Sequence, residues 1–182
     1  MRLLIIKISM IFFIMPLASF GQNRNVPDSS IDQLAQFEYM VGNWQVNMNI
    51  RQDDGTFKAI EDTAKVKAFY HHDGRTFQSI FTMENGFYST DLRTYNVVEN
   101  EWQIMFLNAK AQRWHKFSAS VEEGTMTTII PGGYSGKEDF DIKVLDLEIS
   151  DNSFVKHVYQ SNDSGQSWVH LYIMNYSKQT NN

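Results

Sequence analysis

After residue 42, apolar and polar residues alternate in short runs, and no long stretch keeps the 3.6-residue period of a helix. The runs are rich in Val, Ile, Thr, Phe, Tyr and Trp, which are common in strands. Nine turn-like segments separate them: Asp53–Gly55, Asp73–Gly74, Glu84–Gly86, Glu99–Asn100, Lys110–Ala111, Glu123–Gly124, Pro131–Gly133, Asp151–Asn152 and Asn162–Gly165. Short connectors join antiparallel strands, and closing such a sheet removes its exposed edges. The pattern predicts an all-β fold, an antiparallel up-and-down β-barrel of about ten strands.

A short N-terminal helix is predicted just ahead of the first strand. Ser30 and Gln33 have the spacing of a capping box, and apolar residues follow at helical spacing over residues 31–37. Gly42 is expected to end this helix.

Connector length decides which residues face each other across a hairpin, so the sequence also predicts which side chains point inward. The predicted pairs include Tyr70 with Phe77, Ser79 with Asp91, Phe77 with Arg93, Tyr95 with Ile104, Arg93 with Phe106, Asp91 with Asn108, Phe106 with His115, and Asn108 with Arg113. One face then collects most of the bulky rings, and we expect it to be the interior.

The predicted interior also contains small and polar residues. A ten-stranded barrel is wide, so small inward residues should leave a cavity; they are Ala64, Ala68, Ser79, Ser89 and Ala119. The polar members, which need partners when buried, are Asp91, Arg93, Asn108, Arg113 and His115. The opposite end should hold Trp44, Val97, Trp102 and Val121. We therefore expect a cup with an apolar base and a polar upper wall.

Residues 1–21 differ from the rest of the chain. Arg2 and Lys7 supply positive charge, an almost wholly apolar run follows, and small residues lie one and three positions before Gln22. These features are typical of a secretory signal peptide cut after Gly21. A membrane anchor is the alternative, but the apolar run is short for a bilayer span of about 20 residues.

Cleavage would leave a linker over residues 22–30 and one barrel domain over residues 31–178. We expect the mature protein to be periplasmic or secreted, with no membrane span. The net charge of −5 argues against nonspecific nucleic-acid binding, which needs basic residues to neutralise phosphates. The chain has no Cys, which excludes disulfides, thiolate metal sites and a thiol nucleophile.

The segment Phe37–Trp44 leads the predicted helix into a Gly-x-Trp motif, Gly42-Asn43-Trp44. This opening resembles that of calycin barrels, which include lipocalins, fatty-acid-binding proteins and nitrobindin-like proteins. The chain is more closely similar to secreted bacterial lipocalin-like proteins of unknown function, in the segments Leu92–Asn96, Trp102, Arg113–Trp114 and Ser161–Trp168. The resemblance covers about residues 37–177 and implies that Trp44 plugs the closed end. It also implies structural roles for Gly42 and Trp102.

The predicted ligand-binding residues come from the inner face and the last strand: Arg93, Tyr95, Phe106, Asn108, Arg113, His115, His170 and Tyr172. Arg93 and Arg113, with His115, have the chemistry to hold an anionic head group such as a carboxylate, because guanidinium donors match two oxygens. The alternative is an internal ion pair of Asp91 with Arg93 or Arg113.

His157 and His170 face each other if the last hairpin loop runs from Asn162 to Gly165. Facing imidazoles can bind a metal or present one nitrogen to haem iron, although a one-residue slip would separate them. Hydrogen-bonded structural histidines are the alternative. The loop Pro131–Gly136 is either a plain hairpin loop or a lid over the open end.

The sequence predicts an exported barrel that binds a small, partly apolar molecule, with or without an anionic group, in its interior. One alternative is an enzyme that uses His115 or His170 as a base while Arg93 holds a developing anion. The other is a haem binder that uses His157 or His170. We predict no cofactor and no metal, assign no catalytic residue, and leave the oligomeric state open.

Overall fold

The computed structural model describes residues 26–179. The predicted signal peptide, residues 1–21, lies outside them together with the first part of the linker, so export stays a prediction. No helix within the described residues is long and apolar enough to cross a membrane.

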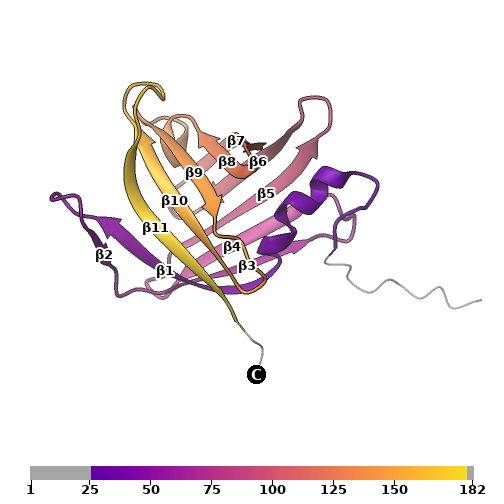
Figure 1. The fold of residues 1–182 in the computed structure, drawn as a ribbon, viewed down its shortest axis with the longest axis horizontal. Helices are drawn as coiled ribbons and strands as arrows, with labels where there is room; N and C mark the ends of the chain where they lie inside the picture. Colours follow the sequence, from indigo (N-terminus) through magenta and orange to yellow (C-terminus); the bar gives the residue numbers. More distant parts are fainter. Residues whose placement is uncertain (1–25, 180–182) are drawn as a thin grey trace, which may run out of the picture.

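Within residues 26–179 the chain forms eleven strands and two short 3₁₀ helices (Figure 1). In chain order they are η1 (Asp32–Met40), β1 (Gly42–Arg51), β2 (Phe57–Ala59), β3 (Ala64–Tyr70), β4 (Phe77–Met83), β5 (Tyr88–Asn96), β6 (Glu101–Asn108), β7 (Arg113–Glu122), β8 (Thr125–Ile130), η2 (Gly133–Ser135), β9 (Asp141–Leu147), β10 (Ser153–Ser161) and β11 (Val169–Lys178). The sheet order is β11-β10-β9-β8-β7-β6-β5-β4-β3-β1-β2, and β11 also pairs with β1. The sheet therefore closes on itself as an antiparallel barrel, as predicted. β2 pairs only with the last residues of β1, on the edge that β3 occupies earlier along that strand, which leaves ten strands in the described barrel wall.

Three of the predicted hairpin registers are confirmed. The β3–β4, β4–β5 and β6–β7 pairs form as expected, for example Phe106 opposite His115. The β5–β6 register is wrong by two residues, because Arg93 lies opposite Ile104 rather than Phe106. The turn between these strands spans residues 97–100 and is longer than predicted. A shift of two keeps every side chain on its predicted face, since strand side chains alternate with a period of two.

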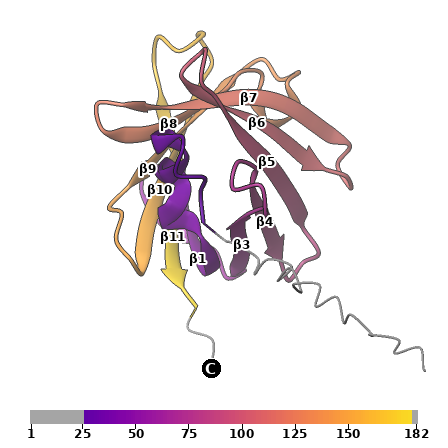
Figure 2. The same ribbon diagram turned by 90° about the vertical axis from the view of Figure 1, so that its right-hand side faces the viewer.

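The 3₁₀ helix η1 lies across one end of the barrel, and Figure 2 looks toward this end. A 3₁₀ helix has three residues per turn, so residues spaced by three share one face. The buried residues of η1 have this spacing: Leu34, Phe37 and Met40. The predicted capping box does not form, because Ile31 is the N-cap residue and no side chain caps the helix.

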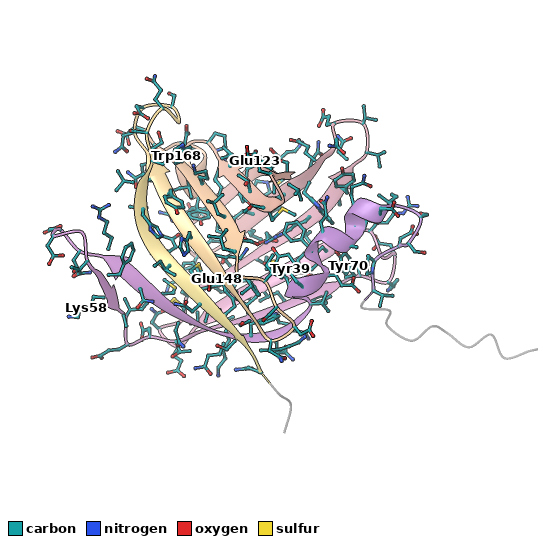
Figure 3. All side chains as sticks on the ribbon, in the orientation of Figure 1. Tyr39, Lys58, Tyr70, Glu123, Glu148 and Trp168 are labelled. Carbon is teal, nitrogen blue, oxygen red and sulfur yellow. The ribbon has the colours of Figure 1, made fainter. Side chains whose placement is uncertain are left out.

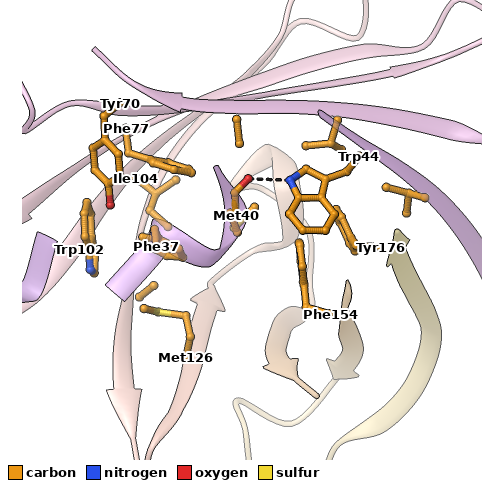
Figure 4. Close-up of a cluster of buried hydrophobic side chains, with 14 of the residues drawn as sticks. Phe37, Met40, Trp44, Tyr70, Phe77, Trp102, Ile104, Met126, Phe154 and Tyr176 are labelled. Atoms are coloured by element: carbon orange, nitrogen blue, oxygen red, sulfur yellow. Dashed lines mark hydrogen bonds between the residues drawn. The ribbon is translucent and has the colours of Figure 1, made fainter. Parts of the chain in front are cut away.

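Aromatic side chains hold η1 against the barrel wall. The ring of Phe37 lies 4.8 Å from that of Trp102 and 5.5 Å from that of Phe77, measured between centroids. Trp44 is fully buried, and its indole nitrogen donates a hydrogen bond of 2.7 Å to the carbonyl of Met40 (Figure 4). Trp44 and Trp102 thus occupy the end that η1 closes.

Gly42 separates η1 from Trp44 with a φ of 135°, a conformation that other residues rarely adopt.

Two residues that were predicted at the apolar base of the barrel lie elsewhere. Val97 is 63% exposed and Val121 is 44% exposed, because Val97 falls in the β5–β6 turn and Val121 lies near the end of β7. The opposite, open end carries β2; Lys58 of β2 and Tyr39 of η1 mark the two ends in Figure 3.

Replacing the buried indole tests the role of this closed end. We expect Trp44→Ala to lower the free energy of unfolding by about 3–5 kcal/mol, because it removes a buried ring and leaves the Met40 carbonyl without its donor. Urea denaturation measures the change. The control is Trp114→Ala on the outer face, where the side chain is 61% exposed and the expected change is within about 0.5 kcal/mol. Equal losses in both variants would contradict the assignment.

Candidate functional site

A cavity of about 300 Å³ lies inside the barrel, between η1 and the open end. Most of its wall is apolar and includes Val66, Phe81, Ile104, Phe106, Phe117 and Met174. Ser79 and Ser89 also line it, in agreement with the prediction that small inward residues leave a cavity in a wide barrel. Apolar walls with a few polar groups are typical of sites for small organic molecules.

The first charged group of the cavity is an ion pair on β5, close to η1. Arg93 donates from Nε to Asp91 at 2.7 Å and from Nη2 to the other carboxylate oxygen at 3.1 Å, and Ser79 donates to the same carboxylate. The guanidinium also lies 4.4 Å from the centroid of the Phe37 ring. Burial alone would lower the pKa of Arg93, but the Asp91 carboxylate raises it above its ordinary value. Arg93 is therefore engaged in the internal ion pair that the sequence offered as the alternative to a ligand contact.

A second buried ion pair lies on the opposite wall. Lys156 of β10 lines the cavity, and its Nζ lies 2.5 and 2.6 Å from the two carboxylate oxygens of Asp146 on β9. The hydroxyl of Tyr39, from η1, donates to the same carboxylate. Burial lowers the pKa of Lys156, and the attraction of Asp146 only partly offsets this effect. Lys156 thus holds its proton less firmly than an exposed lysine.

The loop between β8 and β9 contributes to the cavity wall. Tyr134 of this loop lines the cavity, with its ring 5.3 Å from that of Phe106 and its hydroxyl 3.4 Å from that of Tyr172. Burial, with the nearby Tyr172 hydroxyl, raises the pKa of Tyr134 well above its ordinary value, so this phenol stays neutral. The loop Pro131–Gly136, called the lid below, therefore covers part of the cavity through Tyr134.

His115, which the sequence assigns to ligand contact, holds this lid instead. Its Nε2 donates to the carbonyl of Pro131 at 2.8 Å, and a Cβ placed on Gly136 would lie only 2.5 Å from its Nδ1. His115 shares the inner face of β7 with Arg113 and Phe117, but the loop covers the ring and keeps it out of the cavity wall. The predicted register of His115 is confirmed, but its ring contacts the loop and not the cavity, because the sequence does not show where the loop folds.

Five of the eight predicted ligand-binding residues line the cavity: Arg93, Phe106, Asn108, Arg113 and Tyr172. Asn108 is buried, and its side-chain oxygen accepts a hydrogen bond from the amide of Ala111. Arg113 starts β7 at the open end, has an exposed side chain, and forms no ion pair within residues 26–179.

Tyr95 does not line the cavity. Its hydroxyl donates to Asn100 at 2.7 Å, and its ring packs against Trp102 at 5.6 Å. Near the end of β5, Tyr95 packs instead against the core cluster that includes Trp102 and the buried residues of η1.

His170 faces the outside of the barrel, and its predicted pairing with His157 is wrong. The β10–β11 register breaks between Val158 and Tyr159, so His170 lies opposite Tyr159 while His157 lies opposite Ile173. Since Val158 lines the cavity, its neighbours His157 and Tyr159 point outward, and His170 stacks on both of their rings. An irregularity in β11, which a sequence register cannot include, has moved His170 to the outer face.

The outer cluster also receives Phe57 of β2, whose ring centroid lies 4.7 Å from that of His170. Burial and the neighbouring His157 lower the pKa of His170 below its ordinary value of 6.5. Within the described residues, no three His, Asp or Glu side chains are placed to hold a metal ion.

Several residues of the site were missed from the sequence, above all Lys156, Asp146, Tyr39 and Tyr134. A signal exists for two of them. Asp146 continues the buried alternation of Ile142 and Val144 along β9, and Lys156 lies directly opposite it on β10. A complementary charge pair at matched inward positions was therefore detectable, whereas Tyr39 and Tyr134 reach the site only through tertiary folding.

No protein-family model and no curated protein matches this sequence. Among solved structures, the S-type phycobiliprotein lyase CPES from Guillardia theta is similar in fold, with a TM-score of 0.54 and 7% sequence identity. The match covers 81% of this chain and 92% of that chain. At this identity the likeness concerns the fold alone.

Two glycine substitutions test the lid. Gly136 and Gly86 both have a positive φ, so alanine is strained at each by roughly 1–2 kcal/mol. Only at Gly136 would the new Cβ collide with His115; at Gly86 it would meet nothing within 4 Å. We expect Gly136→Ala to speed hydrogen exchange of the amides of residues 132–136 and Gly86→Ala to leave them unchanged. Equal exchange in both variants would show that the His115 contact does not hold the loop.

Proposed function

We propose that this protein binds a small, partly apolar organic molecule that carries an anionic group, inside the barrel cavity. The observation that carries the proposal is the cavity itself, about 300 Å³ of largely apolar space within a domain that otherwise packs its rings tightly. A molecule that fills it would gain roughly 25 cal/mol for each Å² of apolar surface removed from water.

The methionines of the wall support a ligand with an irregular apolar body. Met40, Met48, Met83 and Met174 line the cavity. Unbranched thioether side chains adapt to different shapes, and they are frequent where a protein surface must accommodate more than one outline. The lid residue Tyr134 adds a hydroxyl, beside that of Tyr172, that can accept or donate a hydrogen bond.

Charge supports placing the anionic group near the mouth of the cavity. Arg93 and Lys156 each face a carboxylate, so the interior pairs have no excess positive charge. Arg113 lines the cavity at the open end and makes no ion pair within the described residues. A carboxylate or sulfonate at the mouth would meet its guanidinium and remain partly hydrated.

The two alternatives from the sequence receive no support from the geometry. An acid–base mechanism needs an imidazole that reaches the ligand, but neither His115 nor His170 lines the cavity. The haem hypothesis needs His157 or His170 inside the barrel, and both stack on its outer face. We therefore propose a binding protein rather than an enzyme of that kind.

Filling the cavity tests the proposal. Ser89 lines the cavity and makes no side-chain hydrogen bond within residues 26–179, so Ser89→Phe should occupy the ligand volume without breaking a network. We expect the affinity for anilinonaphthalene sulfonate, followed by its fluorescence, to fall at least about tenfold. The control is Ser118→Phe, which makes the same change on the outer face of β7. An unchanged affinity in Ser89→Phe would place the probe outside the barrel.

A second substitution tests the anionic group. Arg113→Gln should weaken binding of decanoate about two- to fivefold, because an exposed ion pair contributes about 0.5–1 kcal/mol, and should leave decanol binding unchanged. Displacement of the fluorescent probe measures both affinities. Arg113→Lys, which keeps the charge, is the control and should retain most of the decanoate affinity. A loss of the same size for decanoate and decanol would contradict a charge contact.

A further inference from the structure

Lys156 has surroundings that differ from those of every other lysine in the described residues. It is the one lysine among them in the buried class, with 9% of its surface exposed, and it lines the cavity. Its Nζ lies 5.6 Å from the centroid of the Phe154 ring and 5.9 Å from that of Tyr176. The amine therefore faces a small, ring-lined space rather than bulk water.

The stability of the fold does not by itself account for this arrangement. Burying an ammonium and a carboxylate costs several kcal/mol in desolvation, and packed apolar residues of similar volume often stabilise a core as well or better. The carboxylate of Asp146 is 1% exposed and also accepts the hydroxyl of Tyr39. The group that remains available to a ligand is the amine, because Lys156 lines the cavity and Asp146 does not.

We propose that Lys156 forms an imine with an aldehyde bound in the barrel cavity, so that the ligand class includes aldehydes with an apolar body. This inference rests on the proposed function, since the aldehyde must first occupy the cavity. The carbonyl would reach Lys156 near η1, and the apolar body would extend toward Phe106 and Phe117.

The chemistry balances without any further reagent. The neutral amine of Lys156 attacks the carbonyl carbon, a C–N bond forms, and the carbonyl oxygen takes up a proton to give a carbinolamine. A second proton lets this oxygen leave as water while the nitrogen lone pair completes the C=N bond. Overall, the ammonium and the aldehyde yield a protonated imine and one water, with both protons of the water coming from the ammonium.

Asp146 is placed to take part in both proton transfers of this reaction. It accepts a proton from the ammonium, can return it to the departing oxygen, and faces a single positive charge before and after the reaction. The buried charge balance therefore does not change when the imine forms. The lowered pKa of Lys156, caused mainly by burial, increases the neutral fraction that can attack.

Reductive trapping tests the inference on the intact chain. The protein is incubated with phenylpropanal and sodium cyanoborohydride, and adducts are located by intact mass spectrometry and peptide mapping. We expect one adduct per chain, on Lys156, formed at least about tenfold faster than on surface lysines, because the cavity holds the aldehyde beside this amine. Lys143, whose ammonium lies over Trp168 on the outside of the barrel, is the internal reference.

Two variants complete the test. Lys156→Arg keeps a cation opposite Asp146 but has no nucleophilic amine, so the fast adduct should disappear while thermal unfolding stays close to that of the parent. Lys143→Arg should leave the fast adduct unchanged. Labelling that is spread over the surface lysines and persists in Lys156→Arg would overturn the inference.

The corresponding alcohol separates this inference from the proposed function. Phenylpropanol has nearly the same shape as the aldehyde but cannot form an imine, and its binding is followed by displacement of anilinonaphthalene sulfonate. Displacement by the alcohol without an adduct from the aldehyde would overturn the imine and leave the binding function standing. If neither the fluorescent probe nor the alcohol binds to the barrel, both proposals fail.

Discussion

The pairing of β1 with β11 closes the barrel and so creates its interior. It runs from Trp44 opposite Lys178 to Ile50 opposite Tyr172, and it turns an open meander into a ring. Once the ring is closed, inward side chains lose contact with bulk water, and every polar group among them needs a partner. The two ion pairs supply such partners, and η1 and the loop Pro131–Gly136 cover the two ends of the ring.

The interior meets the requirement by pairing its charges locally. Arg93 faces Asp91 on the same strand, and Lys156 faces Asp146 on the next strand, so each charge has its counter-ion within hydrogen-bond distance. Together the two pairs are neutral, and they lie beside apolar walls rather than replacing them. The charges inside the cavity are therefore paired, whereas Arg113 at its mouth forms no ion pair within residues 26–179.

The two ends of the barrel are closed by different means. At one end η1 contributes rings and thioethers that pack as tightly as a core, with Trp44 joined to Met40 by a hydrogen bond. At the other end a short glycine-containing loop is held by the imidazole of His115 and by a contact between Tyr134 and Tyr172. Apolar packing therefore closes one end, whereas hydrogen bonds hold the loop at the other.

The sequence was enough to predict the barrel class, the inward face of most strands and the position of Trp44, because alternation and connector length act between neighbouring residues and neighbouring strands. Even the wrong β5–β6 register kept Arg93 and Phe106 inside, since an error of two residues preserves the faces. Contacts formed on folding set the surroundings of His170, His115 and the Asp146 carboxylate. An irregularity in β11 turned His170 outward, a loop folded over His115, and η1 brought Tyr39 to the carboxylate that faces Lys156. These outcomes depend on contacts between segments that are distant along the chain, and local patterns do not encode them.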